Sequence, residues 1–140
     1  MIVLDTNVLS ELLRPAPTPQ VLRWVAAQPA SQLFTTTITQ AEILYGIEIL
    51  PKGKRRSALQ SVVEAIFEQN FAGRVLPFAS DAARLFASIV ASRRTLGRPI
   101  EKFDAQIAAI ARSHRAAIAT RNTPDFDDCG VTVLDPWNSQ

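Results

Sequence analysis

Short apolar runs alternate with longer amphipathic segments along this chain. The helical pattern is clearest in residues 59–67, where apolar side chains recur at i, i+3, i+4, i+7 and i+8. The apolar runs are short and rich in strand-forming residues, and they lie at residues 2–4, 33–36, 74–78, 117–119 and 131–134. Strands that alternate with helices in this way favour a parallel sheet that is covered by helices on both faces.

The first apolar run ends at a carboxylate. Residues 2–4 are followed by the polar turn Asp5-Thr6-Asn7 and then by a helical pattern. Because ligands of open α/β sheets bind outside the carboxyl ends of the strands, we expect Asp5 at the rim of a crevice. Taken alone, an aspartate after a strand is more often a turn former or a helix N-cap than a ligand.

Further polar residues stand where strands end or helices begin. Glu42 lies three residues after Thr39, which is the spacing of a helix-capping box and offers a structural role for this glutamate. Asp104 lies in the first turn of a later helix, and Asn122 and Asp125 follow the fourth apolar run. Since the ends of parallel strands share one edge of a sheet, these side chains are expected to converge on the first carboxylate.

A cluster of carboxylates needs a compensating charge. Carboxylates in a partly buried site repel one another unless some are protonated or a cation neutralises them. Cys129 is the only cysteine, and we interpret the only histidine, His114, as a structural residue at a helix end. Ligands that are all oxygen atoms point to Mg²⁺ or Mn²⁺, and such a site suits hydrolysis of a phosphodiester.

The composition sets the broad class of the protein. The chain has 140 residues, of which 47% are hydrophobic and 20% are charged, as in soluble globular proteins. This length suits one core, and we expect residues 1–140 to form a single domain. No apolar run approaches the roughly 18 residues that span a bilayer, and the N-terminus has no signal-peptide pattern, so we expect a cytoplasmic protein.

Two groups of basic residues stand out although the net charge is only +2. A solvated surface is the more common interpretation of such groups, and contact with RNA phosphates or with an acidic partner is the alternative. The first group stands at the start of a helix, where cations oppose the helix dipole, so helix stability does not explain it. The first group is Lys52, Lys54, Arg55 and Arg56, and the second is Arg93, Arg94 and Arg98, which lead through Lys102 towards Asp104.

Four motifs, in their order along the chain, resemble a known family. They are Val3-Leu4-Asp5-Thr6-Asn7-Val8, Ile38-Thr39-Gln40-Ala41-Glu42, Phe103-Asp104-Ala105-Gln106-Ile107-Ala108-Ala109 and Ala119-Thr120-Arg121-Asn122-Thr123-Pro124-Asp125-Phe126. With the closing Asp135-Pro136-Trp137, the chain resembles the PIN-domain ribonucleases, specifically the VapC toxins of type II toxin–antitoxin systems and their FitB-like subgroup. The resemblance implies a three-layer α/β/α PIN-like fold around a mainly parallel sheet of about five strands.

The resemblance also implies an activity and a set of site residues. Similar proteins are endoribonucleases that hydrolyse RNA phosphodiester bonds with a water activated by Mg²⁺ or Mn²⁺. By this resemblance Asp5, Glu42 and Asp104 bind the metal, and Thr6 and Thr120 are candidates to orient a carboxylate or the attacking water. The resemblance implies a cognate antitoxin as partner and assembly as a homodimer or a toxin–antitoxin hetero-oligomer. It also implies that DNA is contacted only through the antitoxin and that there is no membrane partner.

One position departs from the pattern of the family. The fourth acidic position falls on Asn122, which can bind a cation through its amide oxygen but carries no charge. Asp125 is a candidate to compensate, and shaping the turn is its structural alternative. The sequence therefore leaves open whether one or two metal ions bind.

Two other functions compete with this interpretation. The first is a catalytically weak interaction module that binds an acidic helical antitoxin and, through it, DNA; the neutral Asn122 is the residue that favours it. The second is a different phosphoryl-handling α/β enzyme or a receiver domain built around Asp5. It is disfavoured because Asp5 has neither a second aspartate two residues on nor a preceding acidic pair.

Overall fold

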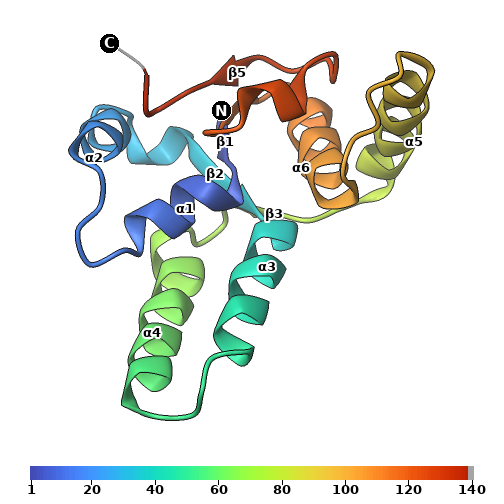
Figure 1. Ribbon diagram of the computed structural model, residues 1–140. Helices are drawn as coiled ribbons and strands as arrows, with labels where there is room; N and C mark the ends of the chain where they lie inside the picture. Colours follow the sequence, from blue (N-terminus) through green and yellow to red (C-terminus); the bar gives the residue numbers. More distant parts are fainter. Residues whose placement is uncertain (139–140) are drawn as a thin grey trace.

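Five parallel strands form the central sheet in the computed structural model, which describes residues 1–138 (Figure 1). The strands are β1 (Ile2–Leu4), β2 (Leu33–Thr36), β3 (Val75–Leu76), β4 (Ala117–Ala119) and β5 (Val133–Leu134). Their order is β3-β2-β1-β4-β5, and every neighbouring pair is parallel. The predicted sheet is therefore confirmed.

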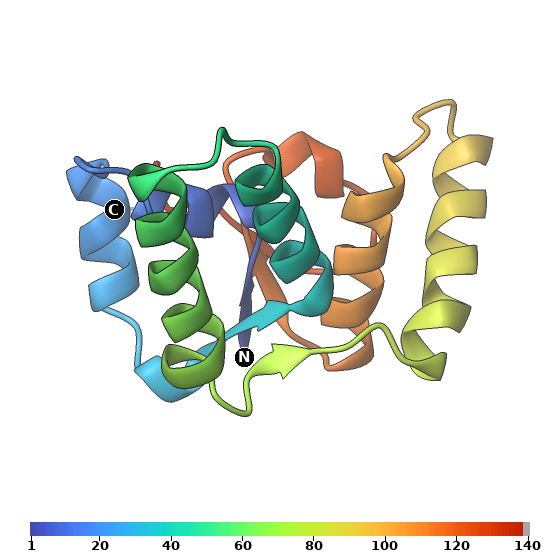
Figure 2. The same cartoon turned by 90° about the horizontal axis from the view of Figure 1, so that it is seen from below.

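Within residues 1–138, six α-helices cover the two faces of the sheet. The first four lie on one face, and α5 and α6 lie side by side on the other (Figures 1 and 2). This arrangement confirms the three-layer α/β/α fold. The helices are α1 (Thr6–Leu12), α2 (Pro19–Ala26), α3 (Thr37–Glu48), α4 (Lys54–Ala65), α5 (Ser80–Thr95) and α6 (Lys102–Ser113), and short helical turns lie at Ala30–Gln32, Ile66–Asn70 and Thr123–Phe126.

Successive strand residues point to opposite faces, so each helical layer has its own core. Val3 and Ile118 belong to the core under α5 and α6, whereas Leu4 and Leu33 belong to the core under α1–α4. Because side chains alternate along a strand, consecutive apolar residues are all buried only when both faces are covered. This coverage explains why the strands are continuous apolar runs.

The helix α6 packs closely on the sheet except at its first turn. Ala105, Ala108 and Ala109 are fully buried, as small side chains allow. The sequence periodicity predicts Phe103 on one face with Ile107 and Ile110, but 48% of Phe103 is exposed whereas both isoleucines are fully buried. Hydrophobic periodicity defines the face of a helix but not where the layer that covers it ends.

The order of the strands creates a crevice between β1 and β4. The chain runs from β1 to β2 on one side of the sheet and returns to β4 on the other side. Leu4 pairs with Ala119 in the register of these two strands. Ligand sites of open α/β sheets lie at such a reversal of strand order, outside the carboxyl ends of the strands. The residues that follow Leu4 and Ala119 therefore face the same crevice.

A buried arginine connects α5 to the segment that follows β4. Arg93 is only 5% exposed, and its guanidinium donates hydrogen bonds to the backbone carbonyls of Arg98 (2.7 Å), Asp125 (2.9 Å) and Asp127 (2.9 Å). The sequence placed Arg93 among the candidate RNA contacts, and its burial contradicts that role. Its donors are used within the protein, where they hold the segment around Asp125 against α5.

Within the described residues, 1–138, no helix combines the length and the hydrophobicity that crossing a membrane requires.

Replacing Arg93 with alanine should destabilise the fold, because three backbone carbonyl groups would lose a charged donor that is itself buried. We expect the free energy of unfolding to fall by about 2–4 kcal/mol. The matched control is Arg94→Ala, which removes an exposed arginine from the same helix and should change stability by less than about 0.5 kcal/mol. Urea denaturation followed by circular dichroism measures both; equal effects would show that Arg93 does not connect these segments.

Candidate functional site

Asp5 lies at the carboxyl end of β1, where the sheet and α1 meet. It is the N-cap of α1, and its carboxylate accepts a hydrogen bond from the backbone N–H of Thr6 (2.8 Å). The hydroxyl of Thr120, which follows β4, donates a hydrogen bond of 2.8 Å to the second carboxylate oxygen. Asp5 is only 5% exposed, and this burial raises the pKa of its carboxyl group although both hydrogen bonds oppose the rise.

Asn7 joins the two turns that follow β1 and β4. Its side-chain N–H₂ donates to the Asp5 carboxylate and to the Thr120 hydroxyl, both at 3.2 Å. Its side-chain oxygen accepts from the backbone N–H of Arg121 at 3.2 Å. The sequence-based prediction included Asn7 in a motif but gave it no role. The signal for a functional role of Asn7 was its place in a polar turn that directly follows a buried strand.

Glu42 reaches the same site from α3. The hydroxyl of Thr6 donates to the Glu42 carboxylate at 2.8 Å and lies 3.0 Å from the hydroxyl of Thr39. Because the Thr6 proton is directed at the carboxylate, the Thr39 hydroxyl is the donor between the two threonines. Burial raises the pKa of Glu42, and the Asp5 charge adds to this rise.

The capping-box role predicted for Glu42 is wrong. The helix α3 begins at Thr37, and its N-cap is Thr36, whose hydroxyl accepts a hydrogen bond of 3.1 Å from the backbone N–H of Thr39. Glu42 therefore lies in the second turn, too far along α3 to reach the cap. The last residue of β2 supplies the cap, so the glutamate side chain is available to the site.

Asp104 enters from the first turn of α6, where the helix N-cap is Glu101. Burial raises the pKa of Asp104 from its ordinary value of 3.8 to about 7, and the nearby charges of Asp5, Asp125, Glu101 and Glu42 add to the rise. A carboxyl group whose pKa is raised to near neutral by burial, and further by neighbouring carboxylates, marks a place where positive charge is missing.

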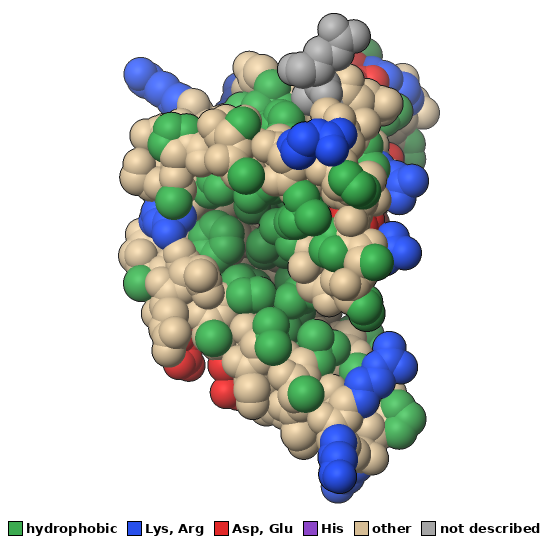
Figure 3. Space-filling view, turned by 90° about the vertical axis from the view of Figure 1, so that its left-hand side faces the viewer, with side chains coloured by type: hydrophobic (Ala, Val, Ile, Leu, Met, Phe, Trp, Pro, Cys, Tyr) green, Lys and Arg blue, Asp and Glu red, His purple; other side chains and the backbone are tan. Residues whose placement is uncertain are grey.

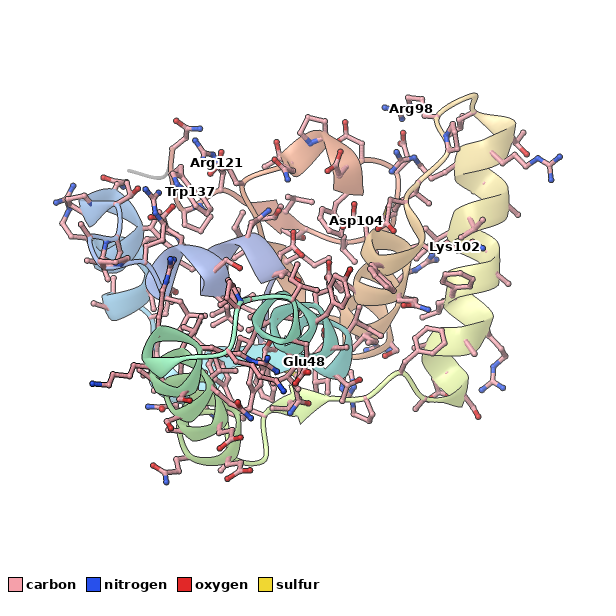
Figure 4. All side chains as sticks on the ribbon, turned by 60° about the horizontal axis from the view of Figure 1, so that its bottom comes forward. Glu48, Arg98, Lys102, Asp104, Arg121 and Trp137 are labelled. Atoms are coloured by element: carbon pink, nitrogen blue, oxygen red, sulfur yellow. The ribbon has the colours of Figure 1, made fainter. Side chains whose placement is uncertain are left out.

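These side chains line one cavity of about 510 Å³. The structure thus brings together Asp5, Thr6, Glu42, Asp104, Asn122 and Asp125, six of the residues predicted from the sequence, while Thr120 lies buried behind Asp5. The remaining lining residues are Asn7, Ser10, Glu11, Arg14, Arg121 and Trp137. Figure 4 shows Asp104 on α6 and, nearer to α2, the neighbouring side chains of Arg121 and Trp137.

The chemistry of the donor set fits a hard divalent cation. The anionic groups that line the cavity are all carboxylates, and the pKa values of Asp5, Glu42 and Asp104 are all raised. Residues 1–138 contain no group of three or more His, Cys, Asp and Glu side chains already arranged to hold a metal ion. Asp5 and Glu42 are instead each stabilised by a threonine hydroxyl. A divalent cation would supply the positive charge that these carboxylates lack.

None of the basic residues predicted to contact RNA lines this cavity. Lys52, Lys54, Arg55 and Arg94 are exposed, Arg56 forms an ion pair of 3.0 Å with Glu48, and Arg98 pairs with Asp127 and Asp128. The cations that do line it are Arg14 and Arg121, which the sequence-based prediction did not select. Arg121 lies inside the motif between Thr120 and Asp125, so its position there was the available signal.

Comparisons with known proteins agree with this geometry. The PIN domain family matches residues 2–130. The VapC ribonuclease Y4jK of Sinorhizobium fredii is 44% identical over 137 residues and covers 98% of each chain. Toxin FitB of Neisseria gonorrhoeae is 38% identical over 138 residues and covers 99% of each chain.

The likeness extends to a solved structure. A chain in the structure of FitAB bound to the IR36 DNA fragment matches with a TM-score of 0.94 and 38% identity, over 100% of this chain and 98% of that chain. The match of the family over residues 2–130 and these near full-length relatives confirm the resemblance that the motifs indicated. This chain belongs to the PIN domain family.

Proposed function

We propose that this protein is an endoribonuclease that depends on Mg²⁺ or Mn²⁺ and is the toxin of a type II toxin–antitoxin pair. The observation that carries the proposal is the acidic cavity at the carboxyl ends of β1 and β4, in which the pKa of Asp104 reaches about 7. A relative at 44% identity that is named a ribonuclease supports the reaction, and one at 38% identity that is named a toxin supports the biological role.

Asp5, Glu42 and Asp104 are the residues that would hold the cation, with Asp125 as a weaker ligand. When bound, a divalent cation supplies charge neutralisation at the attacked phosphate and lowers the pKa of the attacking water. The neutral Asn122 leaves the cavity with one carboxylate fewer than the pattern of the family provides, and we therefore infer a single metal ion.

The polar residues around the ligands orient the carboxylates. Thr120 and Asn7 both donate to the same oxygen of Asp5, which fixes the plane of its carboxylate. The Thr6 hydroxyl donates to one oxygen of the Glu42 carboxylate and restricts its orientation. Because donors held by the sheet and by helix starts need little reorganisation during the reaction, the carboxylates stay aimed at the place where the phosphate is attacked.

A groove that adjoins the acidic cavity supports the proposed antitoxin partner. It has a volume of about 330 Å³ and lies between α1, α3 and α4, lined by apolar residues that include Leu13, Ile43 and Leu59 and by the cations Arg14 and Arg55. Hydrophobic side chains gather in a hollow on the face that carries α1, α2 and α4 (Figure 3). An amphipathic helix with an acidic flank has the matching chemistry.

The FitAB structure with bound DNA supports contact with DNA through such a partner. The homodimer stays a prediction.

Replacing Asp5 with asparagine should abolish catalysis without unfolding the protein, because the amide keeps the shape of a buried side chain while it removes a charge. We expect cleavage of RNA in Mg²⁺ to fall by more than about 100-fold, and EDTA should reduce wild-type cleavage to the same level. The matched control is Asp81→Asn on α5, an exposed aspartate paired with Arg84, which should cleave like wild type.

The outcomes of this experiment separate the competing functions. Equal cleavage by wild type and Asp5→Asn would contradict the proposal and indicate a contaminating nuclease. A pure wild-type protein that binds an acidic helical partner but cleaves no RNA would instead favour the interaction module. Incorporation of phosphate onto Asp5 would favour the phosphoryl-handling enzyme or receiver domain.

The stability of the metal-free protein should depend on pH through Asp104. Its pKa is raised in the folded state, from 3.8 to about 7, so the folded state binds the proton more tightly and stability falls as pH rises through this window. Asp104→Asn removes the effect. With allowance for solvent screening, we expect this variant to be about 1–2 kcal/mol more stable than wild type at about pH 8, with the gain lost at about pH 4.

Urea denaturation in EDTA at both pH values measures this difference, and Asp81→Asn again serves as the control for loss of a surface carboxylate. Saturating Mg²⁺ should reduce the gain of Asp104→Asn at high pH, because the cation then neutralises the wild-type carboxylate. An Asp104→Asn variant that is less stable than wild type at high pH would contradict the electrostatic assignment.

Asn122→Asp should strengthen metal binding, since it adds a charged ligand to the cavity. We expect the Kd for Mn²⁺ to fall by about tenfold or more. Isothermal titration calorimetry gives both the Kd and the number of ions bound. Asn70→Asp, outside the cavity, controls for a general gain of negative charge, and an unchanged Kd in Asn122→Asp would show that residue 122 does not face the bound cation.

A further inference from the structure

One cation stands at the acidic cavity without an acidic partner. The guanidinium carbon of Arg121 lies 5.3 Å from the centre of the Trp137 ring, and both residues line the cavity (Figure 4). Among residues 1–138, Arg121 takes part in no ion pair, whereas Arg14, the other cation of the cavity, pairs with Glu11 at 3.3 Å. The charge of Arg121 is therefore available to a ligand.

An RNA substrate needs such a charge. The cavity is lined by Asp5, Glu11, Glu42, Asp104 and Asp125, and these carboxylates repel the phosphates on either side of the scissile bond. A metal ion compensates this repulsion only at the attacked phosphate. Affinity for the flanking phosphates must come from cations of the protein that lie outside the ring of carboxylates.

The backbone of Arg121 is tied to the catalytic carboxylate. Its N–H donates to the side-chain oxygen of Asn7 (3.2 Å), and Asn7 also donates to Asp5 (3.2 Å). On either side of Arg121, the hydroxyl of Thr120 donates to Asp5 (2.8 Å), and the N–H of Asn122 donates to that hydroxyl (3.1 Å). The place of Arg121 relative to Asp5 is therefore fixed by four hydrogen bonds.

The indole of Trp137 supports the guanidinium. The Asp135 carboxylate accepts a hydrogen bond of 2.9 Å from the backbone N–H of Trp137, which forms a tight turn around the buried Pro136. The ring packs against the core that contains Leu4 and Ala119. A guanidinium stacked on an aromatic face loses little conformational freedom on binding and keeps its N–H groups free for a phosphate.

We propose that Arg121 binds an RNA phosphate next to the scissile bond and that Trp137 is the positioning residue that holds its guanidinium in place. The proposal rests on the ribonuclease function proposed above. It gives a role to the closing Asp135-Pro136-Trp137 motif, which at the level of sequence contributed only to the family resemblance. A purely structural role, in which Arg121 merely covers the Trp137 ring, is the competing explanation.

The test compares Arg121→Gln and Arg121→Lys with wild type on a mixed-sequence single-stranded RNA in Mg²⁺. Loss of a ground-state phosphate contact should raise KM by about tenfold in Arg121→Gln and leave kcat within about twofold. The slope of log KM against log salt should fall by about 0.7 in this variant, as expected for one lost phosphate contact to a single strand. Arg121→Lys should keep the wild-type slope.

Controls separate substrate contact from stability. Arg84→Gln removes an exposed arginine outside the cavity and should leave KM and slope unchanged. Trp137→Leu should raise KM in the wild-type background but add little in the Arg121→Gln background, because the two residues act through one contact. If Trp137→Leu fails to fold, the Arg121 variants still decide the question.

A second measurement keeps this proposal separate from the ribonuclease function. Fluorescence anisotropy gives the Kd of the same RNA on Asp5→Asn and on Asp5→Asn/Arg121→Gln, and the second protein should bind about tenfold more weakly. If wild type cleaves no RNA but this difference is present, the proposed activity fails and the phosphate contact stands. If wild type cleaves RNA but Arg121→Gln leaves KM, Kd and the salt slope unchanged, the phosphate contact alone is overturned. The same holds if Arg121→Gln lowers only kcat.

Discussion

The pairing of β1 with β4 in one register is the constraint on which the site depends. Leu4 pairs with Ala119, so the next residues, Asp5 and Thr120, meet side by side, and the Thr120 hydroxyl reaches the Asp5 carboxylate at 2.8 Å. If one of the two strands slipped by one residue, its side chains would turn to the opposite face of the sheet and this contact would be lost. The order of the whole site therefore depends on this pair of short strands, whose last two residues in each case are fully buried.

The site opposes the stability of the fold that carries it. Burying Asp5, Glu42 and Asp104 near one another raises the pKa of each, and the hydroxyls of threonine residues offset only part of this effect. A structural site would have paired these carboxylates with arginine. Uncompensated repulsion between carboxylates is instead typical of a site that binds a cation. Relief of this repulsion then adds to the free energy of binding what it removed from the free energy of folding.

Burial and geometry, rather than residue type, divide the arginines of this chain among different tasks. Arg93 is buried and donates to three backbone carbonyls, so it holds the segment that carries Asp125. Arg14 pairs with Glu11 at 3.3 Å, whereas Arg121 is stacked on an indole with its charge free among the described residues. The same guanidinium thus stabilises the fold, balances a carboxylate or faces a substrate, according to what surrounds it.

The sequence by itself determined the strands, the parallel sheet and the carboxylates at its edge, because burial on both faces imposes continuous apolar runs and parallel strands end together. Only the tertiary structure decided that Thr36 rather than Thr39 caps α3, that Phe103 is exposed, that Arg93 is buried and that Trp137 supports Arg121. The cap of α3 follows from where β2 ends, at Thr36, and the other three depend on contacts between segments distant in sequence. Local periodicity describes one helix or strand at a time, and it contains no information on where the neighbouring layer ends or which side chain arrives from it.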